Sequence, residues 1–115
     1  MNVHHIAFRT HNLPRLVAFY REAFGFALEH DNGERSVWLR AGNAILMLER
    51  AEAGEPLPSP HGMDFVAFAI SPAERDTFER RFVANGAAIE TKTDFTLYVR
   101  DPDGRRVGVS HYPQR

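Results

Sequence analysis

Hydrophobic and polar residues follow the same order twice along the chain, once in residues 1–50 and again in residues 63–115. Each half opens with a short apolar run, at residues 5–8 in the first half and at residues 65–68 in the second. A helical pattern follows each run, and three short alternating segments separated by turns come after it. The repeat predicts two modules of the order strand–helix–strand–strand–strand, joined by a spacer over residues 51–62.

Both predicted helices have a capped start and a glycine at the end. Asn12 is placed to cap the first helix, and the pair Ser71 and Glu74 has the spacing of a capping box at the second. Gly25 and Gly86 follow the helical patterns, where a residue that tolerates positive φ is expected. One apolar stripe runs along each helix, formed by Leu13, Leu16, Val17, Tyr20 and Phe24 in the first and by Phe78, Phe82 and Val83 in the second.

Short alternating segments predict three further strands in each module. Their ranges are 26–30, 36–41 and 44–50 in the first module and 89–92, 96–100 and 106–111 in the second. Prolines at positions 56, 58 and 60 predict a semi-rigid spacer. A four-stranded module cannot bury both faces of its sheet. We therefore expect two modules, from one chain or exchanged between two chains, to leave a pocket between their sheets.

Composition narrows the class of protein. With 115 residues, of which 43% are hydrophobic and 25% charged, the chain has the make-up of one folded domain. The absence of cysteine excludes disulfides, thiolate metal sites and a cysteine nucleophile. A net charge of −1 argues against nucleic acid as a partner. The longest apolar run, residues 44–48, is too short to span a membrane, and no export signal precedes it. We expect a cytoplasmic protein with a small-molecule partner.

These motifs together resemble the vicinal oxygen chelate superfamily, which includes glyoxalase I, bleomycin-resistance proteins, fosfomycin-resistance thiol transferases and extradiol dioxygenases. The resemblance covers nearly the whole chain and rests on His5-Ile6-Ala7-Phe8, Asn12-Leu13, Phe19-Tyr20, Phe24-Gly25-Phe26, Phe65-Val66-Ala67-Phe68 and Tyr98 through Asp101-Pro102-Asp103-Gly104. It implies an α+β fold in which two βαβββ modules have mixed sheets that enclose a pocket, with one helix packed on each sheet. It also implies a single domain over residues 1–115 and a homodimer.

Members of the superfamily usually hold a divalent metal with His and Glu side chains on the first and last strands of each module, where the metal polarises substrate oxygens. The resemblance puts these positions at His5, Met47, Phe65 and Gly108, with Met47 assigned on the basis that its two neighbours pack against the helix. Only His5 can act as a ligand, because the side chains of Phe65 and Gly108 have no donor atom and the thioether of Met47 suits hard cations poorly. We therefore predict no metal site. The alternative is a divalent metal held by His5, Glu49 and a third ligand.

Candidate residues on the first module each have a functional and a structural interpretation. His5 is a general base or hydrogen-bond anchor, or it is satisfied by a backbone carbonyl or water. Arg9 and Arg40 clamp an anionic group, or they pair with carboxylates at the rim. Trp38 stacks on a planar ligand or fills the core. Glu49 is an acid, base or ligand, or a solvent-facing carboxylate at a strand end.

The second module offers fewer polar candidates. The hydroxyl of Tyr98 is a pocket donor only if Leu97 and Val99 are not the inward pair. Ser110 shares a face with Gly108, whose missing side chain leaves room that a ligand, or Phe65 from the other module, could fill. Alternation places His111 on the opposite face from Gly108 and His4 opposite His5. The Arg105-Arg106 pair follows a turn and is predicted to be solvated.

Three functional hypotheses follow. The first is a small-molecule-binding member of the superfamily without the usual metal, whose ligand contacts His5, Arg9, Trp38, Met47, Glu49, Phe65, Tyr98, Gly108 and Ser110. The second is a metal-dependent lyase, thiol transferase or dioxygenase that uses His5 and Glu49. The third is a stable dimer with no small-molecule role. Whether the protein is an enzyme stays open at this point.

Overall fold

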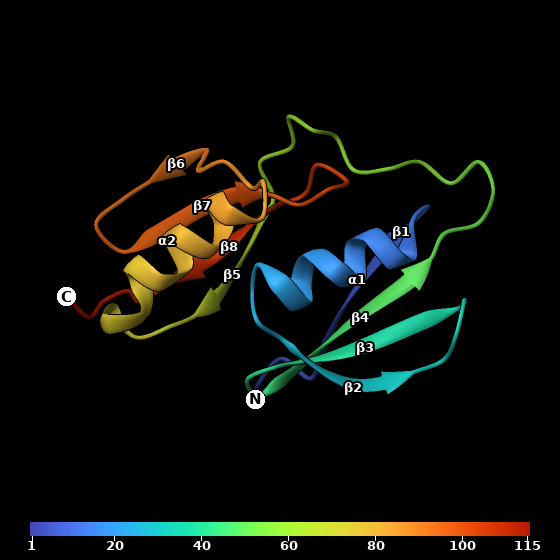
Figure 1. Cartoon of the computed structure of the whole chain (residues 1–115), viewed down its shortest axis with the longest axis horizontal. Coiled ribbons are helices and arrows are strands. Elements are labelled where there is room, and N and C mark those ends of the chain that lie inside the picture. The colour runs from blue at the N-terminus through green and yellow to red at the C-terminus, as the bar shows by residue number, and fades with distance from the viewer. The chain divides into compact units, whose positions relative to one another are not determined.

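The computed structural model describes all 115 residues and divides them into two compact units, Met1–Leu57 and Pro58–Arg115. The boundary lies within the segment expected to be a spacer. Each unit contains one mixed four-stranded sheet and one α-helix that lies across that sheet (Figure 1). The prediction of an α+β fold made of two βαβββ modules is therefore confirmed. No helix has the length and apolar character needed to cross a membrane.

The first unit follows the predicted order of elements. Its strands are arranged β1-β4-β3-β2, with β1 parallel to β4 and the other neighbours antiparallel. The elements are β1 (His5–Thr10), α1 (Leu13–Glu22), β2 (Ala27–Asp31), β3 (Ser36–Ala41) and β4 (Ala44–Arg50).

The second unit repeats this arrangement with the strand order β5-β8-β7-β6. The registers also agree: Ala7 pairs with Met47 in the first sheet, and Ala67 pairs with Gly108 at the same step of the second. The elements are β5 (Phe65–Ala69), the 3₁₀ turn η1 (Pro72–Glu74), α2 (Arg75–Ala84), β6 (Thr91–Lys92), β7 (Thr96–Arg100) and β8 (Arg106–Ser110).

The core of the first unit lies between α1 and one face of the first sheet. The side chain of Asn12 accepts a hydrogen bond from the backbone N–H of Arg15, which caps the helix as predicted. Leu16 and Tyr20 of the helix stripe are fully buried. From the sheet, the core includes Phe8, Val37, Leu39, Leu46 and Leu48. Because strand side chains alternate, the residues between these positions point to the opposite face.

The second core is built in the same way, with one error in the predicted helix stripe. Phe82 is fully buried, whereas Val83 is 62% exposed because it lies on the side of α2 away from the sheet. The capping box of Ser71 and Glu74 forms, but it opens a 3₁₀ turn and the α-helix begins only at Arg75. The sheet contributes Leu97, Val99, Val107 and Val109.

Three predicted strand boundaries shift. The strand predicted at residues 26–30 is Ala27–Asp31, because the ring of Phe26 stacks on Tyr20 in the core instead of entering the sheet. The predictions for residues 89–92 and 106–111 shorten to Thr91–Lys92 and Arg106–Ser110. At the end of both helices the glycine prediction is confirmed, with φ of 75° at Gly25 and 78° at Gly86.

Candidate functional site

The first sheet carries most of the predicted site residues on the face turned away from α1, called here its helix-free face. The buried partners Leu46 and Leu48 point toward the helix, so Met47 between them points away, as predicted. Register places Met47 beside Ala7 on one side and Trp38 on the other. The helix-free face of the first sheet comprises His5, Ala7, Arg9, Ser36, Trp38, Arg40, Ile45, Met47 and Glu49.

Strand register separates His5 and Glu49, the pair that the alternative metal site requires. His5 pairs with Ile45, whereas Glu49 pairs with Arg9. Four residues along a strand correspond to about 13 Å, while metal–ligand bonds to N and O are about 2 Å long. The structure therefore places His5 and Glu49 at opposite ends of the face and does not bring them to one point.

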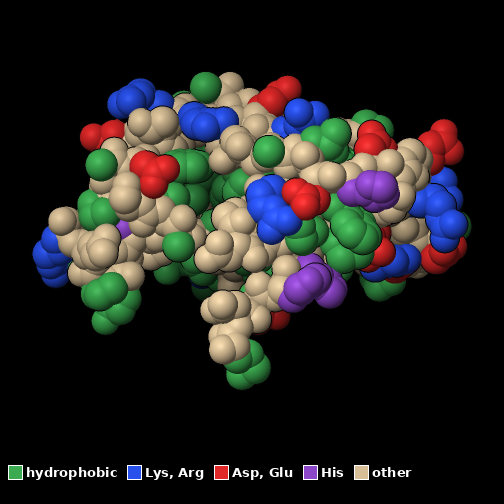
Figure 2. Space-filling model, turned by 90° about the horizontal axis from the view of Figure 1, so that it is seen from below, with side chains coloured by type: hydrophobic (Ala, Val, Ile, Leu, Met, Phe, Trp, Pro, Cys, Tyr) green, Lys and Arg blue, Asp and Glu red, His purple; other side chains and the backbone are tan.

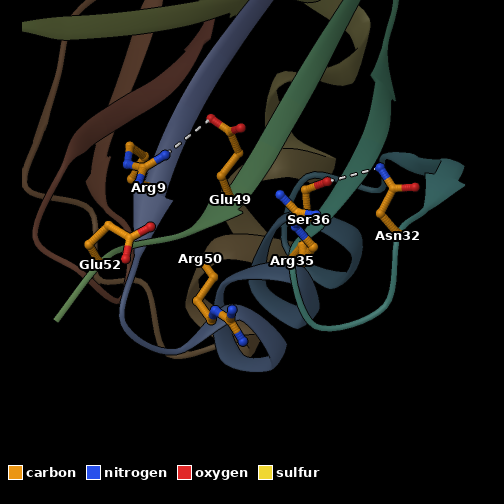
Figure 3. A pocket seen from close by; sticks show the side chains of 7 residues that line it. All are labelled: Arg9, Asn32, Arg35, Ser36, Glu49, Arg50 and Glu52. Atoms are coloured by element: carbon orange, nitrogen blue, oxygen red, sulfur yellow. Dashed lines mark hydrogen bonds and ion pairs between the residues drawn. The ribbon is translucent and has the colours of Figure 1, made fainter.

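The polar end of this face lines a hollow of about 720 Å³. Figure 3 shows Arg9 and Glu49 reaching toward each other from β1 and β4, with an Nη1–Oε1 distance of 3.9 Å. Asn32 donates a hydrogen bond to the Ser36 hydroxyl at 3.1 Å across the same hollow. The lining residues are Arg9, Asn32, Arg35, Ser36, Glu49, Arg50 and Glu52.

The arginines of the helix-free face are engaged by carboxylates. Arg9 donates to both oxygens of Glu55 at 2.8 and 3.0 Å, and Arg40 donates to both oxygens of Glu29 at 3.3 and 2.7 Å. These hydrogen bonds lower the pKa of Glu55 and of Glu29 and raise the pKa of both arginines. The geometry matches the interpretation of Arg9 and Arg40 as members of rim ion pairs. Over the face shown in Figure 2, acidic and basic side chains are interspersed.

The prediction that His4 points away from His5 is wrong. The strand begins only at His5, so alternation does not extend back to His4. The two Nδ1 atoms lie 2.9 Å apart and the rings meet edge to face, with centroids separated by 5.2 Å. His5 is exposed, and its ring is hydrogen-bonded by the neighbouring imidazole and not by a backbone carbonyl.

Trp38 lies on the helix-free face and is half-buried, not part of the core beneath α1. Its ring contacts the ring of His30, with centroids 5.5 Å apart. The indole Nε1 is buried and has no hydrogen-bond partner. Buried donors in folded proteins are nearly always paired. Trp38 therefore has a hydrogen-bonding requirement that the chain does not meet.

The helix-free face of the second sheet is more apolar. Leu97 and Val99 are fully buried against the helix side of the sheet. Tyr98 between them therefore points to the opposite face, which it shares with Gly108. Ser110 also lies on this face and is hydrogen-bonded to the hydroxyl of Thr96 at 2.8 Å. This face comprises Phe65, Ala67, Ala69, Thr96, Tyr98, Arg100, Arg106, Gly108 and Ser110.

Gly108 leaves no opening, in contrast to the prediction. A Cβ atom at this position would overlap the backbone carbonyl oxygen of Leu97 and would lie 3.2 Å from Cε1 of Phe65. The main chain of β7 and the ring of Phe65 thus already occupy the space that a side chain would need. The ring of Phe65 lies there, but it comes from β5 of the same module and not from the other module.

The prediction that Arg105 and Arg106 are solvated is also wrong. Their side chains are only 12% and 13% exposed. Arg105 pairs with Asp101 at 3.0 Å and with Asp103 at 3.4 Å, and both carboxylates are buried. The rings of Phe65 on β5 and Tyr98 on β7 cover Arg106, and the local sequence of the turn does not indicate them. The available signal was alternation, which puts Arg106 on the same face as Gly108.

The prediction for His111 agrees with its contacts. Its Nε2 lies 3.4 Å from Nη1 of Arg75, the first residue of α2, so it points to the helix side of the sheet. His111 is 7% exposed, and Phe95 packs against its ring. It is thus separated from the helix-free face.

The donor set does not fit the metal centre that the resemblance implies. Of the four ligand positions, only His5 carries a metal-binding side chain. No group of three or more His, Asp, Glu or Cys side chains is arranged to hold a metal ion. A catalytic zinc site takes three protein ligands, and within each unit the side chains do not supply such a set.

Comparison with known proteins identifies the class of protein. The sequence model of the Glyoxalase/Bleomycin resistance protein/Dioxygenase superfamily matches residues 2–109. The chain therefore belongs to this superfamily, which confirms the resemblance seen in its motifs. Many members of the superfamily use a metal.

Individual relatives include proteins of different activities. Metallothiol transferase FosB from Shouchella clausii (strain KSM-K16) is 26% identical over 114 residues, which cover 93% of this chain and 77% of that protein. The crystal structure of lactoylglutathione lyase from Agrobacterium tumefaciens is similar with a TM-score of 0.76 and 25% identity, over 96% of this chain and 93% of that one. Fosfomycin resistance protein FosX from Listeria monocytogenes shares the fold, with a TM-score of 0.79 at 16% identity over 95% and 89% of the two chains.

Proposed function

We propose that this protein is a small-molecule-binding member of the superfamily that works without the usual metal centre. The observation that carries the proposal is the chemistry of the four ligand positions, at which Met47, Phe65 and Gly108 replace metal-binding side chains. At position 108 the backbone of Leu97 leaves no space for any side chain, so a glutamate there is incompatible with this packing. At this one position, packing and residue type both support the proposal.

The proposed ligand contacts are on the helix-free faces of the two sheets. Met47 and Phe65 supply apolar surface, and Trp38 supplies an indole ring whose N–H has no partner in the chain. His5 and Tyr98 supply exchangeable hydrogens, while Arg9, Glu49 and Ser110 stand at the polar margins. The contacts on each face by itself favour a compact, partly aromatic or apolar molecule. The proposal treats residues 1–115 as one domain and the protein as a cytoplasmic homodimer.

Metal content is the measurement that tests this proposal. Tag-free protein and His5→Ala are analysed side by side by elemental mass spectrometry after purification without added metal and after incubation with Mn²⁺, Ni²⁺ or Zn²⁺. We expect far less than one ion per chain in both proteins. One divalent ion per chain in the parent, lost in His5→Ala, contradicts the proposal. Light scattering of the same samples tests the dimer.

The second candidate is a metal-dependent lyase, thiol transferase or dioxygenase. Its support is the similarity to the metallothiol transferase FosB together with His5 at a position that holds metal in the superfamily. Because His5 and Glu49 lie at opposite ends of one face, this candidate needs ligands other than that pair. A thiol-transfer assay with Mn²⁺ present, compared in the parent and in His5→Ala, distinguishes it from a binding protein.

A further inference from the structure

Arg106 on β8 is a nearly buried cation that lies on an aromatic platform. Its guanidinium carbon is 4.2 Å from the centroid of the Tyr98 ring and 5.6 Å from that of Phe65. The two rings lie 4.3 Å apart with an angle of 30° between their planes. This stacking fixes the orientation of the guanidinium group, but an aromatic face provides no hydrogen-bond acceptor in the plane of the five N–H donors.

The acidic neighbour of Arg106 is already engaged by another arginine. Nε of Arg106 is 3.6 Å from Oε1 of Glu90, and the Arg106 side chain forms no hydrogen bond. Both oxygens of Glu90 accept hydrogen bonds from Arg100, at 2.5 and 3.0 Å. One carboxylate therefore faces two guanidinium groups, and the Nε of Arg106 is buried without an acceptor.

Arg105, the residue before Arg106, is a buried arginine whose charge is paired within the chain. Arg105 is equally buried, yet it contacts two buried carboxylates, Asp101 and Asp103. Burial of a charge is costly unless hydrogen-bonded partners of opposite charge accompany it. Arg106 lacks such a partner within the chain, so an oxyanion from outside would complete its surroundings.

We propose that Arg106 binds the oxyanion of the small-molecule ligand, a carboxylate, phosphate or phosphonate group; this rests on the proposed function. A guanidinium group donates two parallel hydrogen bonds to two oxygens of such a group. Only Nε is completely buried, so the terminal nitrogens keep access to a ligand. The hydroxyl of Tyr98, which forms no hydrogen bond, is a second donor on the same face.

The residues around Arg106 define the rest of the ligand. Gly108 pairs with Tyr98 on one side and with Ala67 on the other, and the Phe65 ring covers Gly108. These groups offer apolar contact and leave the guanidinium as the cation of this surface without a hydrogen-bonded partner. The matching ligand is a small aromatic or apolar body that carries one oxyanion.

The test uses benzoate and phenylphosphonate as anionic probes and benzamide as a neutral probe of the same shape as benzoate. Binding to the full-length protein is followed by the arginine Nε–H signals in ¹⁵N NMR spectra, in phosphate-free buffer of low ionic strength. Both anions are expected to bind saturably, to shift the Arg106 signal and to bind more tightly than benzamide. Arg106→Gln is expected to weaken anion binding about tenfold or more. Arg40→Gln is the matched control, because Arg40 is hydrogen-bonded by Glu29 on the other sheet, and it should leave binding unchanged.

A second variant and a stability measurement distinguish an anion-binding role of Arg106 from a purely structural one. Arg106→Lys retains the charge without the planar fork and should bind with intermediate affinity, which decides the matter if Arg106→Gln does not fold. A purely structural role predicts that Arg106→Gln lowers the melting temperature while anion affinity stays that of the parent, and this result overturns the proposal. Failure of both anions to bind the parent saturably also overturns it. Stoichiometric metal lost in His5→Ala contradicts the proposed function but leaves the Arg106 result intact, so the two failures are distinguishable.

Discussion

The two sheets share strand order and register, but the arginines on their helix-free faces have different partners. On the first sheet, Arg9 and Arg40 are exposed and each is hydrogen-bonded by both oxygens of a glutamate. On the second, Arg106 lies stacked on aromatic rings and shares a carboxylate with Arg100. A duplicated backbone thus fixes where side chains stand, while the side chains themselves decide whether the face is hydrated or apolar.

Glutamate substitutions at equivalent positions on β4 and β8, the last strands of the two sheets, should differ most in their effect on stability. Gly108→Glu should destabilise the fold by about 4 kcal/mol or more, because its Cβ overlaps a backbone carbonyl and its carboxylate enters a buried site. Met47→Glu, at the equivalent half-buried position, should cost much less. Urea unfolding followed by circular dichroism measures both. Equal losses in the two variants would show that the faces do not differ in this way.

Loss of the Glu90 carboxylate, which Arg100 and Arg106 share, should lower stability more than loss of the Glu29 carboxylate on the first sheet. Glu90→Gln leaves both Arg100 and Arg106 without a carboxylate and should cost about 1 kcal/mol, a modest value because Glu90 is 33% exposed. Glu29→Gln, which removes an exposed pair with Arg40, should change stability less. Denaturant midpoints of the two variants, compared with the parent, test this order. A larger loss in Glu29→Gln contradicts it.

Acid should weaken both units through their arginine-paired glutamates. Hydrogen bonds from arginines hold the pKa of Glu29, Glu55 and Glu90 below the ordinary value of 4.5. The unfolded chain then binds more protons than the folded one, so this stability is complete above 4.5 and is lost as pH falls through the lower folded-state values. Unfolding free energies measured from neutral pH to about pH 3 should decline in this window. Glu90→Gln should flatten the decline, and an unchanged slope would contradict the assignment.

Trp38 should give the smallest effect on stability. Trp38→Phe removes a buried donor that has no partner, so the unfolding free energy should change by less than about 1 kcal/mol in either direction. As the one tryptophan of the chain, Trp38 also reports ligand binding at the first sheet through its fluorescence. A ligand that quenches this fluorescence in the parent should bind less tightly to Trp38→Phe, as measured by calorimetry. Equal affinities would remove Trp38 from the proposed site.

Alternation along the strands predicted much of the candidate site. Because the side-chain period of a strand is two, the apolar pair Leu46 and Leu48 was enough to place Met47 and Glu49 on the other face. The same rule could not place Tyr98, since Leu97 and Val99 are apolar too and only packing against α2 shows which set is buried. It failed for His4, which precedes the strand and has no fixed alternation.

The sequence by itself determined the repeated βαβββ order, the superfamily and the absence of metal-binding side chains at three of four expected positions. These properties depend on periodicity, on capping and turn residues and on residue type, all of which are local in the chain. Only the tertiary structure decided that Glu49 stands far from His5, that the backbone of Leu97 fills the space beside Gly108, and that Arg106 is buried on Tyr98 without a hydrogen bond. Each depends on strand register or on a neighbour from another strand, and residues distant in sequence acquire such neighbours only when the sheet forms.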